Sequence, residues 1–321
     1  MTLLRASRRA ERVAVAALAV VPLLPFLSAA VSIDAPVFLA VARQIAAHPA
    51  DPFGFDMIWD PTSPHVAAFN HNPPLLSYYL AGWMVTFGDA ERVLHAALLP
   101  FPLLAALAFC GIARRFTGRG LGPAALLVVT PAFLVLATTL MLDVPLLAWL
   151  LCAVYALLRA REAPGVGWQL AAGAAAAAAG LTKYAGLMSA PLLAAGLIWL
   201  WPGGSPRMDR SRARAGVALR VLGIPLAAWS AWGIYTFALY GAPHFAGGLA
   251  LVGARSFATS AFWNHAASVP IYYGGALLFP LLAWLGRARS HGWGAGLALT
   301  AGGLVALLVL PAGTPARRIP L

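Results

Sequence analysis

The sequence predicts an all-α polytopic membrane protein, and three observations lead to this fold class. Hydrophobic residues make up 61% of the 321 residues and charged residues only 10%, and the mean hydropathy is +0.80. Soluble domains average about half apolar and about a quarter charged residues, so one soluble core cannot bury this much apolar surface. The apolar residues also occur in long runs flanked by arginine, as in membrane-spanning helices. The composition excludes a disordered protein, a disulfide scaffold and an ordinary soluble enzyme.

Nine apolar runs predict about nine spans, since one span needs about 20 residues. The first run, 13–31, follows a cluster of arginines and is longer than the apolar core of a typical signal peptide, so we expect an uncleaved helix. The other runs are 93–113, 121–137, 144–158, 168–181, 186–201, 217–239, 270–285 and 293–310. We expect one transmembrane domain over residues 1–321.

The arginines predict the orientation of these helices. With the N-terminus in the cytoplasm, the clusters within 114–119, 159–161, 207–214 and 287–289 all lie on the cytoplasmic side. The net charge of +12 therefore reflects membrane topology and indicates no nucleic-acid partner. A long first loop, 32–92, and a later loop, 240–269, then lie outside. Arg317 and Arg318 fall outside against the rule, which indicates a misassigned last span or a chain that lacks a C-terminal part present in relatives.

This orientation requires that the apolar stretch 73–87 does not cross the membrane. The stretch has about 15 residues and opens with Pro73-Pro74, so we expect a juxtamembrane helix at the outer leaflet.

Three ionisable side chains, Asp34, Asp143 and Lys183, fall at the outer face in this topology. Ionisable groups at membrane depth are costly and therefore indicate function. Two other interpretations stay open. Each aspartate precedes a residue followed by proline and could cap a helix, and Lys183, the one lysine of the chain, could extend to the lipid head groups.

The outer loops supply further candidate binding residues. Paired prolines after His71-Asn72 fix a rigid entry into the juxtamembrane helix, and these side chains could bind a polar head group or a metal. A solvated loop histidine and an interfacial aromatic belt are the alternatives. Arg255 could bind a phosphate or touch lipid head groups. The complete set of candidate binding residues is Lys183, His71, Asn72, Tyr78, Arg92, Arg255 and His265.

The sequence contains no Walker loop, Rossmann glycine pattern, Cys/His metal cluster or Gly-x-Ser-x-Gly motif. No nucleotide cofactor is therefore expected. An enzyme acting at the outer face needs a donor that is already activated there, and a lipid-linked donor meets this need.

A series of short motifs resembles a known superfamily. In chain order they are Ser32-Ile33-Asp34, His71-Asn72-Pro73-Pro74-Leu75, Phe87-Gly88, Arg114-Arg115-Phe116, Pro131-Ala132-Phe133, Leu142-Asp143-Val144-Pro145-Leu146 and Leu181-Thr182-Lys183-Tyr184. Their order and spacing over about residues 10–200 resemble the GT-C glycosyltransferases that use polyprenyl-phosphate sugars. The branch is the one that joins protein O-mannosyltransferases and the lipid A aminoarabinose transferase. Two departures are Asp34-Ala35 for Asp-Glu and the Asn72 inserted into His-Pro-Pro.

The resemblance implies a GT-C-like transmembrane helix bundle and an inverting glycosyltransferase. The enzyme would move a sugar from a polyprenyl-phosphate donor to a lipid, glycan or protein acceptor at the outer face of a bacterial inner membrane. Asp34 would be the general base, and Lys183, with Arg92 and Arg255 as alternatives, would stabilise the leaving phosphate. Asp143 would orient the acceptor, hold Lys183 or help bind a divalent metal together with Asp34 and His71. Metal dependence stays open, and membrane lipids are the expected surroundings.

Two other function classes remain. A transporter or flippase of a lipid-linked or anionic substrate would use Asp143 and Lys183 as a coupling pair. A non-catalytic scaffold would tolerate substitution of both residues and of Asp34. No internal repeat or inverted pair of broken helices is evident, and the long acidic outer loop favours the enzyme.

Overall fold

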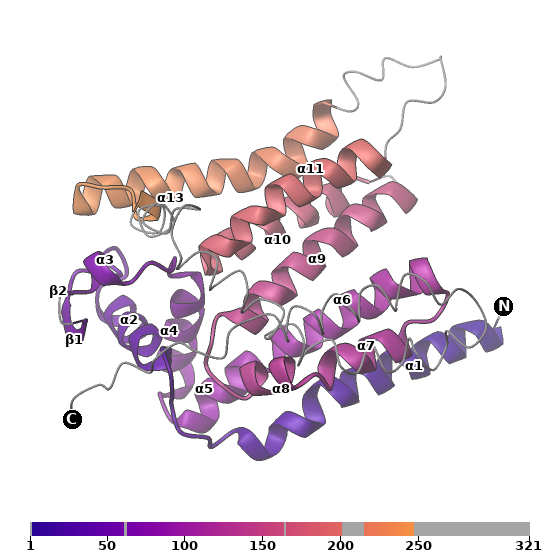
Figure 1. The fold of residues 1–321 in the computed structure, drawn as a ribbon, viewed down its shortest axis with the longest axis horizontal. Coiled ribbons are helices and arrows are strands. Elements are labelled where there is room, and N and C mark those ends of the chain that lie inside the picture. Colours follow the sequence, from indigo (N-terminus) through magenta and orange to yellow (C-terminus); the bar gives the residue numbers. More distant parts are fainter. Residues whose placement is uncertain (1, 61–62, 164, 201–214, 247–321) are drawn as a thin grey trace, which may run out of the picture. The chain divides into compact units, whose positions relative to one another are not determined.

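The computed structural model describes residues 2–60, 63–163, 165–200 and 215–246. All of these except Thr130–Ala132 belong to one compact unit. This unit is mostly helical, with long helices lying beside one another and the elements of the first loop gathered at one end (Figure 1). The all-α class is thereby confirmed at this coarse level.

The helices fall into a long and a short group. The longer helices are α1 (Thr2–Val20), α6 (Pro100–Thr117), α9 (Asp143–Glu162), α10 (Val166–Thr182), α11 (Ser189–Leu200) and α13 (Ile224–Tyr240). The shorter helical elements are η1 (Val21–Phe26), α2 (Ala35–Ala47), α3 (Val66–Phe69), α4 (Leu75–Phe87), α5 (Glu91–Leu98), α7 (Leu121–Val128), α8 (Pro131–Ala137), η2 (Tyr184–Met188) and the π-helical η3 (Leu219–Gly223).

Three described helices are long and apolar enough to cross a membrane: Glu91–Thr117, Asp143–Glu162 and Ala215–Tyr240. They contain the predicted runs 93–113, 144–158 and 217–239. The runs 168–181 and 186–201 fall on α10 and on η2 with α11, which are shorter. The runs 270–285 and 293–310 lie outside the described residues, so the number of nine spans stays a prediction.

Two predicted spans are not single helices. The run 13–31 is α-helical only to Val20 and continues as the 3₁₀ helix η1, because Pro22 and Pro25 cannot donate a backbone hydrogen bond. The run 121–137 is divided into α7 and α8. Proline disfavours helical backbone at the residue before it, and Pro131 begins the second helix.

The first loop forms helices and one small hairpin. Strand β1 (Asp56–Asp60) pairs antiparallel with β2 (Ser63–His65), a feature that the sequence interpretation did not include. Helix α4 packs on α2, where the Ser77 hydroxyl donates to the Phe38 carbonyl at 3.0 Å. The helix expected at 73–87 is confirmed as α4, which follows Pro74 and ends at Gly88 with a positive φ of 87°.

The end of the unit opposite the first loop is held by ion pairs. Glu11 pairs with Arg114, and its carboxylate also accepts the backbone N–H groups of Gly120 and Leu121 at 2.8 and 2.7 Å. An anion at these free N–H groups stabilises the start of α7. Arg115 pairs with Glu162. Of the arginine clusters predicted for one side of the membrane, those within 114–119 and 159–161 lie at the ends of α6 and α9, on one end of the bundle (Figure 1). The clusters within 207–214 and 287–289 lie outside the described residues.

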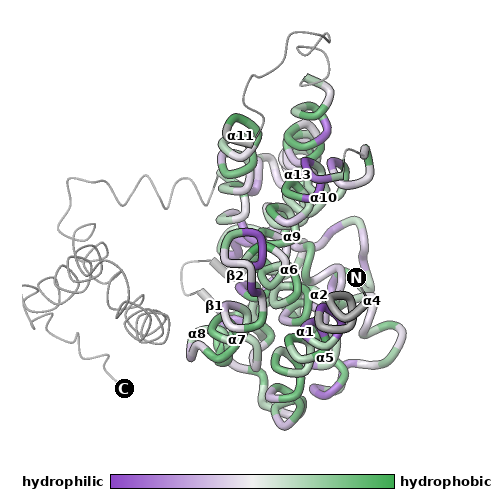
Figure 2. Tube along the Cα trace, turned by 90° about the vertical axis from the view of Figure 1, so that its right-hand side faces the viewer, coloured by the Kyte–Doolittle hydropathy of each residue, from purple (hydrophilic) through white to green (hydrophobic). Residues whose placement is uncertain are grey.

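Small residues allow the helices to approach closely. Helix α10 packs on α9 and α13, and its buried face is rich in alanine. A Cβ atom at Gly173 or Gly180 would collide with η3 or with Trp229. Figure 2 shows hydrophobic colour along the long helices and hydrophilic colour around β2.

Candidate active site

The geometry of the candidate site centres on an ion pair between two residues that are 40 positions apart. The Lys183 Nζ atom donates to Asp143 Oδ1 at 2.9 Å, and each side chain is about one third exposed (34% and 31%). The predicted proximity of the two residues is confirmed. Asp143 is the first residue of α9, after the N-cap Leu142, so the helix dipole adds to the stabilisation of its carboxylate. The interpretation of Asp143 as the N-cap of this helix is therefore wrong.

Lys183 directly follows the last residue of α10 and has an extended backbone. Helix α10 ends at Thr182, whose hydroxyl donates to the Ala178 carbonyl, and Lys183 is extended with φ −152° and ψ 140°. The following turn η2 packs so closely that a Cβ atom at Gly186 would overlap the backbone of Ala179. Glycine at this position therefore lets η2 pack against the end of α10 and holds Lys183 beside Asp143.

Asp34 lies at the N-cap of α2 but does not cap it with its side chain. The residue is exposed, and among the described residues its carboxylate has no hydrogen bond or ion pair. The preceding residue, Ile33, has a φ of 59°, which is a strained conformation for a β-branched residue. Such strain costs about 1–3 kcal/mol and tends to occur at functional sites. Helix α4 contacts both α2 and α10, so α2, which follows Asp34, lies at the end of the bundle where α10 reaches Lys183 (Figure 1).

A buried histidine adjoins the ion pair through Tyr184. The Tyr184 hydroxyl lies 2.7 Å from His244 Nδ1 and accepts a hydrogen bond from Trp232 Nε1 at 3.2 Å. The His244 ring stacks on Phe53, with ring centroids 4.7 Å apart. Burial disfavours the charged ring and lowers the pKa of His244 to about 4. At neutral pH the ring is therefore uncharged.

Hydrogen bonds around Phe53 and Tyr240 connect the first loop to the end of α13. Phe53 is fully buried, and its backbone N–H donates to the Tyr240 hydroxyl at 3.1 Å. The Tyr240 hydroxyl in turn donates to Asp51 Oδ1 at 2.6 Å, and Tyr235 donates to the Ala50 carbonyl. These contacts join segments more than 180 residues apart.

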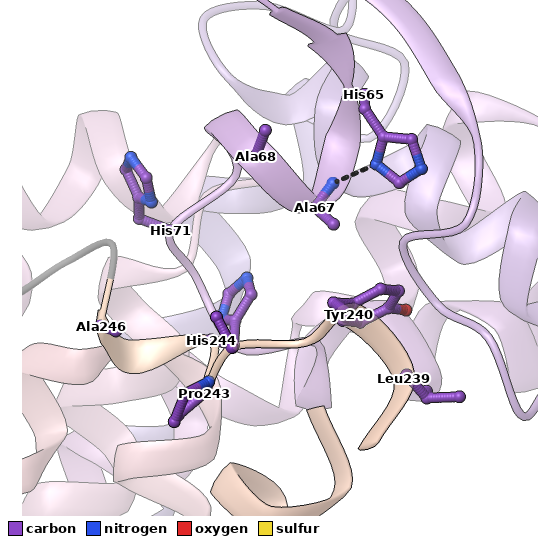
Figure 3. Close-up of a pocket in the computed structure, with 10 residues that line it drawn as sticks. His65, Ala67, Ala68, His71, Leu239, Tyr240, Pro243, His244 and Ala246 are labelled. Atoms are coloured by element: carbon purple, nitrogen blue, oxygen red, sulfur yellow. Dashed lines mark hydrogen bonds between the residues drawn. The ribbon is translucent and has the colours of Figure 1, made fainter. Parts of the chain in front are cut away.

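A cavity of about 550 Å³ opens beside this cluster. Its polar lining comes from His65, His71, Tyr240 and His244, and the remaining lining is mostly alanine and proline (Figure 3). His65 is engaged, because its Nδ1 accepts the backbone N–H of Ala67 at 3.3 Å. Within the described part of the chain His71 has no hydrogen bond, and it lies in the cavity wall together with the buried His244.

The other predicted binding residues have different places. Asn72 lies next to the cavity wall, where its backbone N–H donates to Asn70 Oδ1 at 3.1 Å. The Tyr78 hydroxyl donates to the Pro49 carbonyl at 2.7 Å, so it ties α4 to the first loop and leaves no free donor. Arg92 is exposed in α5. Arg255 and His265 lie outside the described residues.

No metal-binding cluster is present among the residues that the structure describes. Figure 3 shows the rings of His65, His71 and His244 pointing in different directions. The suggested grouping of Asp34, Asp143 and His71 as metal ligands stays a prediction.

Sequence reasoning did not select Phe53, Tyr184, Tyr240 or His244. The nearest signal was the aromatic content of the first loop and the position of Tyr184 beside Lys183. Neither shows that the first loop meets the end of α13.

The segment that carries most of these residues is similar to a known protein family. Residues 92–246, just under half of the chain, match the family model described as dolichyl-phosphate-mannose-protein mannosyltransferase. The match confirms the resemblance to the superfamily. The segment matched to the mannosyltransferase family contains Asp143, Lys183, Tyr184 and His244, whereas Asp34 and the first-loop residues precede it.

One solved structure is also similar. It is that of the S. cerevisiae protein O-mannosyltransferase Pmt1-Pmt2 complex bound to the sugar donor, with 18% sequence identity and a TM-score of 0.49. The similarity covers 73% of this chain and 34% of that chain, so the present chain spans about a third of that relative's length. The comparison with curated proteins found no significant match.

Proposed function

We propose that the protein is an inverting membrane glycosyltransferase that uses a polyprenyl-phosphate sugar as donor. The observation that carries the proposal is the Asp143–Lys183 ion pair, because it lies within the segment that matches the mannosyltransferase family. The description of that family makes a mannosyl donor and a protein acceptor the first choice, with a lipid or glycan acceptor next.

Lys183 provides the positive charge for the leaving polyprenyl phosphate. A phosphate leaving group gains negative charge as the bond to the sugar breaks, and a fixed ammonium nearby stabilises that charge. Asp143 holds Lys183 in place through their 2.9 Å contact. The remaining exposure of about a third leaves room for a phosphate oxygen to approach Nζ. Asp143 is thus a positioning residue in this scheme.

Asp34 acts as the general base. Its carboxylate is exposed and has no partner among the described residues, so it is free to accept a proton from an acceptor hydroxyl. The acceptor oxygen then forms a bond to the anomeric carbon while the bond to the phosphate oxygen breaks on the opposite face. The strained Ile33 backbone supports an interpretation in which the direction of Asp34 is constrained.

The 550 Å³ cavity is the proposed place of the sugar or acceptor. The cavity is linked to Lys183 through two residues. His244 in the cavity wall is hydrogen bonded to Tyr184, which is the next residue after Lys183. The volume of the cavity is within the range of about 300–1,000 Å³ that is usual for small-molecule sites. The catalytic end would face the outside of the membrane, in line with the positive-inside rule.

The experiment is a transfer assay with membranes that contain the full chain. Labelled polyprenyl-phosphate mannose and a serine- and threonine-rich acceptor peptide are supplied, and label on peptide, glycan and lipid fractions is measured. We expect transfer with the wild type and a loss of at least about 100-fold with Lys183→Gln. Arg43→Gln, which breaks only an exposed surface pair with Asp89, is the matched control and retains transfer.

The transporter alternative gives a different result in the same membranes. A flippase moves the labelled lipid between leaflets without transferring the sugar. Donor translocation without transfer, abolished by Lys183→Gln, would contradict the glycosyltransferase proposal.

A further inference from the structure

A second, larger cavity lies at the opposite end of the bundle from the Asp143–Lys183 pair. It has a volume of about 940 Å³ and lies among α6, α9 and α10, close to the start of α1. Figure 1 shows α6 and α9 spreading apart toward the end that carries the N-terminus. The walls are mostly apolar, with Leu104 and Leu107 from α6, Trp149 from α9, and Trp168, Ala171 and Ala174 from α10.

The mouth of this cavity has a surplus of positive charge. Five arginines line it, Arg8, Arg12, Arg114, Arg115 and Arg159, whereas Glu162 is the one carboxylate in its lining. A second carboxylate, Glu11, is already occupied by Arg114 and by two backbone N–H groups.

Three of the guanidinium groups are incompletely paired. Within the described residues, Arg8 and Arg12 form no ion pair, and the buried Nε of Arg159 has no hydrogen-bond partner. Glu162 binds Arg115 at 2.7 Å and lies 3.4 Å from Arg159, so it has little capacity left. An additional anion would complete the pairing of these groups.

The remaining part of the chain is poor in negative charge. Residues 247–321 contain no aspartate or glutamate. Residues 201–214 contain one, Asp209, together with four arginines. These segments therefore add at most one carboxylate side chain to a cavity lined by five arginines, and a bound anionic molecule is the better source of the missing charge.

The aromatic residues of the cavity place two of the arginines at its wall. The Arg115 guanidinium lies 4.9 Å from the ring centroid of Tyr155, and that of Arg159 lies 5.2 Å from the ring of Trp168. Such cation–π contacts hold a guanidinium in place and leave edge N–H groups free to donate. The site is thus a mostly apolar cavity with guanidinium groups held at its wall.

We propose that this cavity binds one anionic phospholipid of the leaflet next to the N-terminus. The phosphate would lie among Arg8, Arg12 and Arg159, and an acyl chain would lie between the leucines of α6 and the alanines of α10. Basic pockets between transmembrane helices on the cytoplasmic side are known to bind anionic head groups. The proposal is independent of the glycosyltransferase assignment, because the two sites lie at opposite ends of the bundle.

The test uses the fluorescence of the two tryptophans in the cavity wall. The full chain is reconstituted in phosphatidylcholine vesicles that contain a minor fraction of phosphatidylglycerol with brominated acyl chains, and quenching is compared with the same fraction of brominated phosphatidylcholine. We expect greater quenching by phosphatidylglycerol. We expect this difference to disappear in the double variant Trp149→Phe/Trp168→Phe. The part of the quenching that the double variant loses comes from the two tryptophans of this cavity. Equal quenching by both lipids, as expected if another part of the chain fills the cavity, would overturn the proposal.

Charge and shape are then changed separately. Arg8→Gln/Arg12→Gln, which leaves Arg5 and Arg9 at the N-terminus, is expected to weaken the preference for phosphatidylglycerol about tenfold or more. Ala174→Phe fills the groove without a change in charge and also abolishes the preference. Arg43→Gln at the opposite end is the control and changes nothing. Full displacement of the lipid by millimolar inorganic phosphate, or an unchanged preference in Ala174→Phe, would show an anion site without an acyl-chain groove and would contradict the proposal.

Discussion

The Lys183 ammonium lies 2.9 Å from the Asp143 carboxylate, and this contact joins the end of α10 to the start of α9. The Arg43–Asp89 pair also lies at this end of the bundle, but both of its side chains are largely exposed. The Lys183–Asp143 contact matters because it places the lysine of the chain at a helix end next to the buried Tyr184–His244 cluster. The predictions below test whether this arrangement serves chemistry or only stability.

Substitution of the ion pair separates these two roles. Both partners are about one third exposed, so Asp143→Asn or Lys183→Gln should lower the free energy of unfolding by only about 1 kcal/mol. Transfer activity should nevertheless fall at least about 100-fold in Lys183→Gln, since the leaving phosphate loses its counter-charge. Thermal unfolding in detergent and transfer by the same preparation check this expectation. A loss of activity no larger than the loss of folded protein would indicate a structural role.

The hydroxyl of Tyr240 is expected to hold the first loop in place. Tyr240→Phe removes the acceptor for the Phe53 N–H and the donor to Asp51, so unfolding stability should fall by about 1–3 kcal/mol. Tyr235→Phe is the matched control, because it removes one exposed hydrogen bond to Ala50 and should cost about 1 kcal/mol or less. Limited proteolysis within residues 48–60 measures release of the loop. Equal protection in both variants would contradict this role of Tyr240.

The buried His244 predicts a loss of stability in acid. Its pKa in the folded protein is lowered to about 4, below the ordinary value of 6.5, so the unfolded chain binds an extra proton between these pH values. Stability should therefore fall as the pH decreases from about 6.5 toward 4, by on the order of 3 kcal/mol in total. The groups around the ring are Tyr184, Phe53, Trp232 and His71.

Thermal unfolding at pH 7 and pH 4.5 measures this effect. His244→Asn keeps a hydrogen-bonding group near Tyr184 but removes the titration, so its unfolding midpoint should change less between the two pH values. The same acid loss in the variant and in the wild type would assign the effect to other groups.

Two glycines make a matched pair of substitutions. At Gly186 a Cβ atom would overlap the backbone of Ala179, so Gly186→Ala should displace η2 and with it Lys183. At Gly82 in α4 nothing lies within 4 Å, so Gly82→Ala should be neutral or stabilising by up to about 1 kcal/mol. We expect transfer to be lost in the first variant and kept in the second. Wild-type activity of Gly186→Ala would show that Lys183 does not depend on this turn.

Some features were predictable because they follow from local patterns. Charge alternation along the chain places Arg114, Arg115 and Arg159 at one end of the bundle and Asp143 and Lys183 at the other, and the structure has this arrangement. The double proline and Gly88 gave the bounds of α4 to within two residues.

Other features depend on contacts that no local pattern contains. The stacking of Phe53 on His244 joins positions 191 apart in the chain. The breaks at Pro22 and Pro25 escaped notice because hydropathy averages over the prolines, although their chemistry ends an α-helix. The capping interpretation of Asp143 was wrong by one residue, since Leu142 already occupies the cap.

The variant Asp34→Asn tests whether Asp34 is the general base of sugar transfer. Membranes with equal amounts of inserted wild-type and variant protein are given labelled polyprenyl-phosphate sugar and acceptor, and the initial rate of transfer is measured. The asparagine keeps the size of the side chain and the N-cap position of α2 but cannot accept the proton. We expect the variant to insert normally and to transfer no detectable sugar. Transfer at the wild-type rate would contradict this role of Asp34.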